Sequence, residues 1–250
     1  MNDPVREQKE RERRLRETTM AYGEFTLLKT VWWNLIELDN VLMRLALKPK
    51  GALLDVGCSD GRLIERLRRK GLGGLWCVGT DFAVNPLKKM LAKNIRALAV
   101  AADATLPLFK PATFDTVVSL GVVQQLASRE ERLRILRCMC RVLRSDGQFA
   151  VTVLNRPSWA SLVANGLEGP LLSSPELFVH LYEPESLRAD LEAAGFEVVE
   201  IVAINNLPVR YLKRIGFLGV WVDMFITKYM KTLSASKGRY LLAVGRKRAV

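Results

Sequence analysis

Between residues 52 and 154 the sequence alternates regularly between two periodicities, and this alternation restricts the fold more than any other feature of the chain. Short apolar runs such as ALLDVG and TFDTVVSL are typical of buried parallel strands. The segments between them carry apolar residues three and four positions apart, as amphipathic helices do. The expected strands are residues 52–57, 74–81, 96–101, 113–120 and 147–154, and the expected helices are residues 62–70, 86–93 and 129–143. Such an order predicts a parallel α/β sheet covered by helices on both faces.

The segments on either side of this core complete the expected domain organisation. Residues 1–48 are expected to form an N-terminal helical cap, because a long stretch of apolar residues at helical spacing precedes the first strand. Residues 49–204 and 237–250 are expected to form one α/β domain. Residues 205–236, an apolar insertion flanked by basic residues, are interpreted as a lid or an interface. The last regular elements are expected at residues 184–196 (helix), 197–204 (strand) and 239–247 (strand).

The loop after the first expected strand reads Asp55-Val56-Gly57-Cys58-Ser59-Asp60-Gly61, and Arg62 begins the next helix. The two glycines allow a sharp turn and a close approach of a ligand to the backbone. Backbone N–H groups at the start of a helix favour an anionic group such as a carboxylate. Because ligands of parallel sheets bind beyond the C-terminal ends of the strands, we expect this loop to hold the anionic part of a ligand.

Two more carboxylates follow the next two strands. Asp81 ends the second strand, where an acidic side chain can accept hydrogen bonds from the hydroxyls of a ribose. Asp103 follows the third strand and can accept from an exocyclic amine. Together with Asp55, these acids predict a site for a nucleoside that carries little or no phosphate.

These motifs resemble the class I S-adenosylmethionine-dependent methyltransferases, in particular the small-molecule (type 11) branch that includes the ubiquinone and menaquinone methyltransferases. The resemblance rests on LLDVGCSDGRL, on the two later acids and on YEPESLRADLEAAGFEVVEI, and it covers roughly residues 20–204 and the last strand. It implies a doubly wound, mostly parallel seven-stranded Rossmann-like methyltransferase sheet with helices on both faces and an antiparallel last strand. It also implies S-adenosylmethionine as cofactor, S-adenosylhomocysteine as product and no metal.

The same resemblance implies a set of cofactor contacts at the ends of the strands. They are Asp55, Gly57, Cys58 and Gly61 for the methionine part, Asp81 for the ribose, Phe82, Asp103 and Ala104 for the adenine, and Ser119 and Leu120 for the opposite side. Ser59 and Asp60 stand where the family more commonly has glycine followed by serine or threonine. The details of the carboxylate contacts therefore stay open.

The catalytic residue is not assigned by the sequence. Methyl transfer is an in-line displacement that gains much of its rate from alignment, so a protein base is not required. Relatives often carry a histidine shortly after the fourth strand, where this chain has GVVQQ at residues 121–125. Gln125 can orient a substrate oxygen or be merely solvated, and the lone His180 can act as a base or be simply packed. Tyr22 and Tyr182 are weaker candidates.

Cysteine usage favours a reducing, cytoplasmic setting. Four cysteines are too few and too unevenly spaced for a disulfide framework, and a single histidine is available to help them bind zinc. Cys138 and Cys140 lie two apart on an expected helix and so face different sides, which argues against a metal site. The charged N-terminal sequence lacks the apolar stretch of an export signal, and no apolar run reaches the 18 residues of a spanning helix.

The net charge of +12 is concentrated near the C-terminus, since residues 205–250 hold ten basic residues and one acidic residue. Within it, residues 207–233 carry basic side chains on both sides of an apolar run. One interpretation is a lid that covers a lipophilic substrate and also lies on an anionic membrane surface. The other is a helix pair packed on the sheet with its cations extended into solvent. On the first interpretation the acceptor is a small lipophilic or anionic molecule, and the protein is membrane-associated.

Two other functions remain as alternatives. An RNA or protein methyltransferase is one, favoured by a pI of about 9.8 and the terminal GRKR. However, the SLGV sequence after the fourth strand lacks the Asn/Asp-Pro-Pro-aromatic element of amino-directed nucleic-acid enzymes, and no cysteine follows a proline. We therefore do not expect nucleic acid as a partner. The other alternative is a non-catalytic relative that only binds the cofactor. The presence of Asp55, Asp81 and Asp103 argues against it. The acceptor atom and the oligomeric state stay open.

Overall fold

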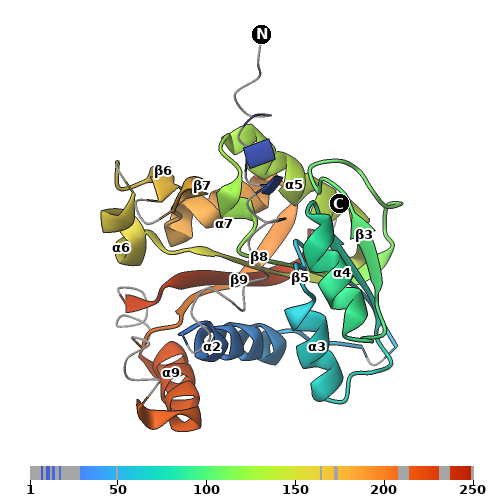
Figure 1. Ribbon diagram of the computed structural model, residues 1–250, viewed down its shortest axis with the longest axis horizontal. Coiled ribbons are helices and arrows are strands. Elements are labelled where there is room, and N and C mark those ends of the chain that lie inside the picture. The colour runs from blue at the N-terminus through green and yellow to red at the C-terminus, as the bar shows by residue number, and fades with distance from the viewer. Residues whose placement is uncertain are drawn as a thin grey trace.

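The computed structural model describes residues 7, 10, 11, 13, 14, 17, 29–48, 50–163, 165–171, 174–207, 214–230 and 237–248. Its centre is a seven-stranded sheet with the strand order β3-β2-β1-β4-β5-β9-β8 (Figure 1). The strands are β1 (Ala52–Val56), β2 (Trp76–Asp81), β3 (Leu98–Ala101), β4 (Phe114–Leu120), β5 (Leu143–Leu154), β8 (Phe196–Ile204) and β9 (Tyr240–Lys247). Only β9 pairs antiparallel with its neighbours in this sheet, so the expected mostly parallel sheet with an antiparallel last strand is confirmed.

The strand order reverses direction between β1 and β4. The chain moves outward from β1 through β2 to β3, then returns to the other side of β1 and continues through β4 and β5. Ligands of such sheets bind at this switch point, beyond the C-terminal ends of the strands. The fold therefore places the glycine loop after β1 beside the segment that follows β4.

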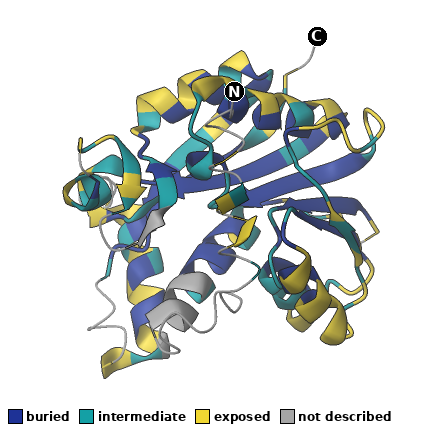
Figure 2. Ribbon diagram, turned by 45° about the horizontal axis from the view of Figure 1, so that its top comes forward, coloured by how far each residue is buried: buried dark blue, intermediate teal, exposed yellow. Residues whose placement is uncertain are grey.

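Helices cover both faces of the sheet. They are α2 (Lys29–Arg44), α3 (Arg62–Arg69), α4 (Val84–Ala92), α5 (Arg129–Val142), α6 (Arg156–Trp159), α7 (Pro184–Ala193) and α9 (Phe217–Tyr229), with the short 3-10 turns η1 (Val123–Gln125) and η2 (Ala160–Leu162). Two buried clusters form, one on each face. Leu53 of β1 belongs to the cluster with Ile64 of α3, whereas the next residue, Leu54, belongs to the cluster with Leu136 of α5. Because successive side chains of a strand point to opposite faces, the central strands are buried along their length (Figure 2).

The helix boundaries follow local sequence signals. Ser128 caps α5 by accepting a hydrogen bond from the backbone N–H of Glu131 over 3.2 Å, and acidic residues in the first turn favour the positive end of the helix dipole. Pro184 stands in the first turn of α7, where its missing N–H costs nothing. Gly195, with φ of +99°, follows α7 and allows the chain to leave the helix.

The sequence pattern did not predict a hairpin that lies beyond the end of β5. It consists of β6 (Glu168–Leu171) and β7 (Ser174–His180), which pair antiparallel. Backbone hydrogen bonds join the chain just after this hairpin to β5, because the N–H of Tyr182 donates to the carbonyl of Leu154 over 3.0 Å. β6 is only four residues long and contains glycine and proline, which are both depleted in strands, so its sequence carries no strand signal.

The described part of the 205–236 insertion is a helix that packs on α2. Val220 of α9 forms a small buried cluster with Ile36 of α2, and α9 lies at one extremity of the molecule (Figure 1). The interpretations of the insertion as a lid, an interface or a helix pair stay predictions. None of the helices in the described ranges is long and apolar enough to cross a membrane.

Candidate functional site

The loop after β1 is held in a shape that only glycine permits at two positions. Gly57 and Gly61 have φ angles of +74° and +78°, in the left-handed region that other residues seldom adopt. The backbone N–H groups of Gly57 and Cys58 both donate to the carbonyl of Thr80, over 2.7 and 2.9 Å. A Cβ on Gly57 would lie 2.1 Å from Cγ2 of Val122, so the loop touches the segment after β4 directly.

Asp81 joins this loop to the end of β2. Its Oδ2 accepts the backbone N–H of Ser59 over 2.9 Å, and its Oδ1 accepts the backbone N–H of Ala83 over 3.0 Å. The carboxylate lies at the C-terminal end of the strand. The fold therefore brings this acid and the glycine loop together.

A cavity of about 420 Å³, called here the first cavity, opens over these strand ends. Its lining residues include Gly57, Asp81, Phe82, Asp103, Ala104, Val122 and Gln125. Oδ1 of Asp103 accepts both the backbone N–H and the hydroxyl of Thr105, over 2.9 and 2.7 Å, which fixes the carboxylate at the rim. Glu10 and Arg13 also line the cavity, so these two residues lie against the site.

Asp55 lies behind the cavity and is completely enclosed. Burial raises the pKa of Asp55 to about 7, because the charged carboxylate loses its hydration. The guanidinium of Arg62 opposes this shift, whereas the nearby carboxylates of Asp81 and Glu37 add to it. Asp55 is therefore a carboxyl group that changes charge near neutral pH.

A second cavity of about 180 Å³ lies over the ends of β4, β5 and β9. Most of its lining is apolar or aromatic, namely Leu120, Leu154, Trp159, Leu171, Leu177, Val179 and Tyr240, while Glu37, Arg62, Gln124, Gln125 and Asn205 supply polar groups. Glu37 is held there by two bonds: Oε1 accepts the hydroxyl of Thr152 over 2.6 Å, and Oε2 lies 3.0 Å from Nη1 of Arg62. Gln125 lines both cavities, so the two adjoin at this side chain.

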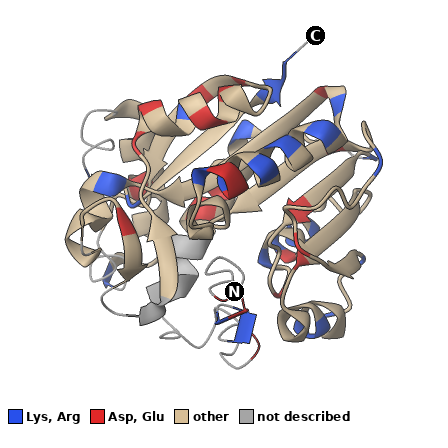
Figure 3. Cartoon of the chain, turned by 90° about the horizontal axis from the view of Figure 1, so that it is seen from above, with Lys and Arg blue, Asp and Glu red and all other residues tan. Residues whose placement is uncertain are grey.

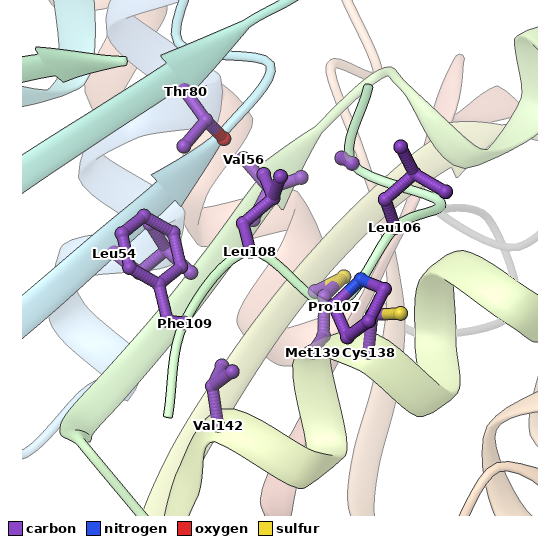
Figure 4. Close-up of a pocket in the computed structure, with 11 residues that line it drawn as sticks. Leu54, Val56, Thr80, Leu106, Pro107, Leu108, Phe109, Cys138, Met139 and Val142 are labelled. Carbon is purple, nitrogen blue, oxygen red and sulfur yellow. The ribbon is translucent and has the colours of Figure 1, made fainter. Parts of the chain in front are cut away.

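A third cavity, beneath residues 106–109, is too small for a ligand (Figure 4). Its volume is about 20 Å³, roughly that needed for one water molecule. Phe109, Met139 and Val142 are among the side chains around it, and Thr80 is one of its few polar neighbours. The third cavity is therefore a packing gap rather than a binding site.

Of the residues expected to contact a cofactor, the structure places Gly57, Asp81, Phe82, Asp103 and Ala104 on the wall of the first cavity. The remaining five do not line it. Leu120 lines the second cavity instead. The others lie in or beside the loop and at the end of β4: Asp55, Cys58 and Ser119 are buried, and Gly61 precedes α3.

Cys58 is buried against α4 rather than presented to the cavity. Its Sγ lies 3.8 Å from the sulfur of Met90, and a Cβ on Gly79 would lie 2.6 Å from the same Sγ. Burial raises the pKa of the Cys58 thiol above its usual range, and the carboxylates of Asp55 and Asp81 raise it further. The thiol is therefore an apolar packing group.

The sequence candidates for catalysis separate in the structure. His180 pairs through Nδ1 with Oε2 of Glu168 over 2.7 Å and packs edge-on against Tyr182. Burial lowers the pKa of His180, although the carboxylate of Glu168 acts in the opposite direction. His180 lines neither the first nor the second cavity, whereas Gln125 lines both. Tyr22 lies outside the described residues.

Tyr182 is also directed away from both cavities. Its hydroxyl donates to Oδ2 of Asp190 over 3.2 Å, and burial raises the pKa of the phenol well above its usual range. Cys138 and Cys140 point to different sides of α5, toward the carbonyls of Thr105 and Gly195. Within the described ranges, no three His, Cys, Asp or Glu side chains are grouped so that they could hold a metal ion.

Apart from Leu120 and Gln125, the residues that line the second cavity were not predicted from the sequence. Glu37 carries a weak local signal, because it is a carboxylate beside Ile36 and Leu38 in the apolar pattern of α2. Asn205 and Tyr240 carry no such signal, since the fold brings them in from the ends of β8 and β9. The hairpin β6–β7 contributes further wall residues, and it was not expected either.

Comparison with known proteins identifies relatives of this chain. A family model described as a methyltransferase domain matches residues 35–201. The human mitochondrial ubiquinone biosynthesis O-methyltransferase is 26% identical over 183 residues, which are 68% of this chain and 45% of that protein. The human probable tRNA methyltransferase 9B is 29% identical over 106 residues, which are 42% of this chain and 22% of that protein. The chain thus spans less than half the length of these curated relatives.

A solved structure supports the same fold. The 1,6-didemethyltoxoflavin-N1-methyltransferase of Burkholderia thailandensis, solved with bound 1,6-didemethyltoxoflavin and S-adenosylhomocysteine, aligns with a TM-score of 0.66 at 17% sequence identity. The alignment covers all of this chain and 92% of that one. At this identity the likeness concerns the arrangement of strands and helices.

Proposed function

The chain belongs to the methyltransferase domain family, and we propose that it transfers the methyl group of S-adenosylmethionine to a small lipophilic or anionic acceptor. The observation that carries this proposal is the pair of adjoining cavities at the C-terminal ends of the strands. One cavity is rimmed by carboxylates suited to a nucleoside, and the other combines apolar walls with a polar end. Methyl transfer from a nucleoside cofactor to a lipophilic acceptor needs one cavity for each of the two molecules.

The residues of the first cavity suit S-adenosylmethionine. Asp81 would accept hydrogen bonds from the ribose hydroxyls, Phe82 would lie along the adenine, and Asp103 would accept from its exocyclic amine. The missing side chain of Gly57 would let the methionine part approach the loop backbone. When bound, this cofactor supplies an electrophilic methyl group on a sulfonium.

The second cavity would hold the acceptor. Its apolar walls and volume of about 180 Å³ favour a compact, largely hydrophobic group. Arg62 and Glu37 mark its polar end, so a polar or anionic substituent of the acceptor would lie near the guanidinium. Gln125, shared by both cavities, would orient the acceptor atom toward the methyl group. Alignment of this kind does not require a protein base.

RNA methylation is a second candidate, because one curated relative is named as a probable tRNA methyltransferase. That similarity covers 42% of the chain. Acidic and basic residues are interspersed along the described helices seen from above (Figure 3). A small acceptor is therefore favoured over a polyanion, which would require a continuous basic surface.

The test is to follow a labelled methyl group from S-adenosylmethionine into a cell extract. The extract is separated into lipid, small-metabolite, RNA and protein fractions, with the Asp81→Asn variant as a control for cofactor dependence. We expect label in the lipid or small-metabolite fraction with the wild-type protein alone. Label confined to RNA or protein, or cofactor binding without any transfer, would overturn the proposal.

A further inference from the structure

Helix α9 presents its apolar side to solvent. Leu218, Trp221, Phe225 and Tyr229 are 63%, 67%, 56% and 62% exposed. They are spaced three and four residues apart, so they form one continuous face of the helix. Ile215 and Val222 are also exposed beside them. Large exposed apolar side chains that are gathered on one face of a helix, rather than scattered singly, indicate a surface for binding a protein or a membrane.

The polar side of the same helix faces inward. Asp223 is fully buried, with Oδ2 accepting the backbone N–H of Leu207 over 2.8 Å and Oδ1 accepting the side-chain amide of Asn206 over 3.2 Å. The same amide donates to the hydroxyl of buried Thr227 over 2.9 Å. These bonds fix the rotation of α9, so its aromatic face cannot turn toward the protein without losing them.

Basic residues flank the exposed face. Asp223, the one acidic residue of α9, is buried, so this helix exposes no carboxylate. Arg214 lies just before α9, and Nζ of Lys228 lies 4.9 Å from the ring centre of Tyr229. Tryptophan and tyrosine with flanking lysine and arginine suit the boundary between lipid headgroups and acyl chains.

The anchor of α9 also adjoins the second cavity. Asn205 lines that cavity, and the next two residues hold Asp223. On α2, Ile36 packs on Val220 while the following residue, Glu37, lines the cavity. A surface that covers α9 would therefore lie close to the proposed acceptor site.

We propose that the outward face of α9 binds the surface of an anionic lipid bilayer, with Trp221 and Phe225 inserted and with Arg214 and Lys228 against the headgroups. The partner is a membrane surface rather than a second protein because the apolar face is flanked by Arg214 and Lys228, while the one acidic residue of α9, Asp223, is buried. Binding depends on the helix face alone, so it is independent of the proposed methyl transfer.

The experiment is vesicle flotation of the full chain without cofactor. Vesicles of phosphatidylcholine are compared with vesicles that also contain phosphatidylglycerol, at low and high salt. We expect the wild-type protein to float with the anionic vesicles, and we expect the bound fraction to fall as salt rises. Absence of binding to anionic vesicles at low salt would overturn the proposal.

Variants separate the two parts of the surface. Trp221→Ser/Phe225→Ser should reduce partitioning onto anionic vesicles at least tenfold. Arg214→Glu/Lys228→Glu should reduce partitioning at low salt, and the difference from the wild type should disappear at high salt. The matched control is Leu98→Ser/Val199→Ser, which replaces two exposed apolar residues elsewhere, 54% and 66% exposed, and should bind like the wild type. Thermal unfolding checks that all variants fold.

Light scattering distinguishes the membrane from a second copy of the chain. A wild-type dimer that Trp221→Ser/Phe225→Ser converts to a monomer, with unchanged vesicle binding, would assign the face to self-association and contradict the proposal. Equal flotation of this variant and the Leu98→Ser/Val199→Ser control would contradict it as well.

Discussion

The backbone N–H of Ser59 donates to Oδ2 of Asp81 over 2.9 Å, which ties the loop after β1 to the last residue of β2. The other oxygen of the same carboxylate accepts from Ala83, ahead of α4. Asp81 therefore shapes the glycine loop and also lines the first cavity. A change at this position should affect both the loop and the cofactor.

Asp81→Asn should weaken binding of S-adenosylhomocysteine at least tenfold, or about 1.4 kcal/mol. An amide has a single acceptor oxygen, so it cannot accept from the loop, from α4 and from the ribose at once. Equilibrium dialysis measures the affinity. The control is Asp146→Asn, whose carboxylate is exposed and pairs with Lys48 away from the cavity. Unchanged affinity of the Asp81→Asn variant would show that Asp81 does not contribute to binding this ligand.

Gly57→Ala should destabilise the protein and abolish cofactor binding. A Cβ would lie 2.1 Å from Val122, and φ of +74° is strained for alanine. Gly71→Ala is the matched control, because Gly71 has φ of +80° but nothing within 4 Å of the added carbon. The control should lose only about 1 kcal/mol of unfolding free energy. Urea unfolding that gives equal losses for the two variants would show that the contact with Val122 is unimportant.

Asp55 should make the stability of the unliganded protein depend on pH. Its folded pKa of about 7 lies above the usual value of 3.8, so the folded state binds a proton that the unfolded state has lost. The unfolding free energy should therefore fall as the pH rises from about 4 to 7 and level off above. Between pH 5 and pH 8 the wild type should lose roughly 2 to 3 kcal/mol relative to Asp55→Asn. Parallel curves for the two proteins would contradict the burial of an ionisable Asp55.

Arg62→Met should destabilise the protein by about 3 kcal/mol, because it leaves the buried carboxylate of Glu37 without its cation. Replacing both partners, as Arg62→Met/Glu37→Met, should recover part of this loss, since the buried carboxylate of Glu37 is then removed together with its cation. A double-mutant cycle by urea unfolding gives the coupling energy. Strict additivity of the two single changes would mean that the pair does not interact.

Local sequence signals indicated part of the first cavity. Gly57 and Asp81 were predicted because each stands at the end of a strand whose apolar run is visible in the sequence. Most of the second cavity was not predictable in this way. Glu37, Asn205 and Tyr240 come from three distant elements, and only the packing of the sheet and α2 brings them together.

The sequence also does not predict which side chains of a strand face the cavity. Val179 and His180 are neighbours on β7, and only Val179 lines the second cavity, because successive side chains of a strand point to opposite faces. Nothing in LFVHLYEP shows which face meets the site. The burial of Asp223 on α9 was not predictable either, since a charged residue within an apolar run suggests an exposed position.

The central claim is that the first cavity binds S-adenosylmethionine. Isothermal titration of this cofactor onto the unliganded wild-type protein tests it most directly, with S-adenosylhomocysteine as competitor. The account predicts one site per chain, competition between the two ligands, and loss of the signal in Gly57→Ala. A folded wild-type protein that gives no binding signal for either ligand would contradict it.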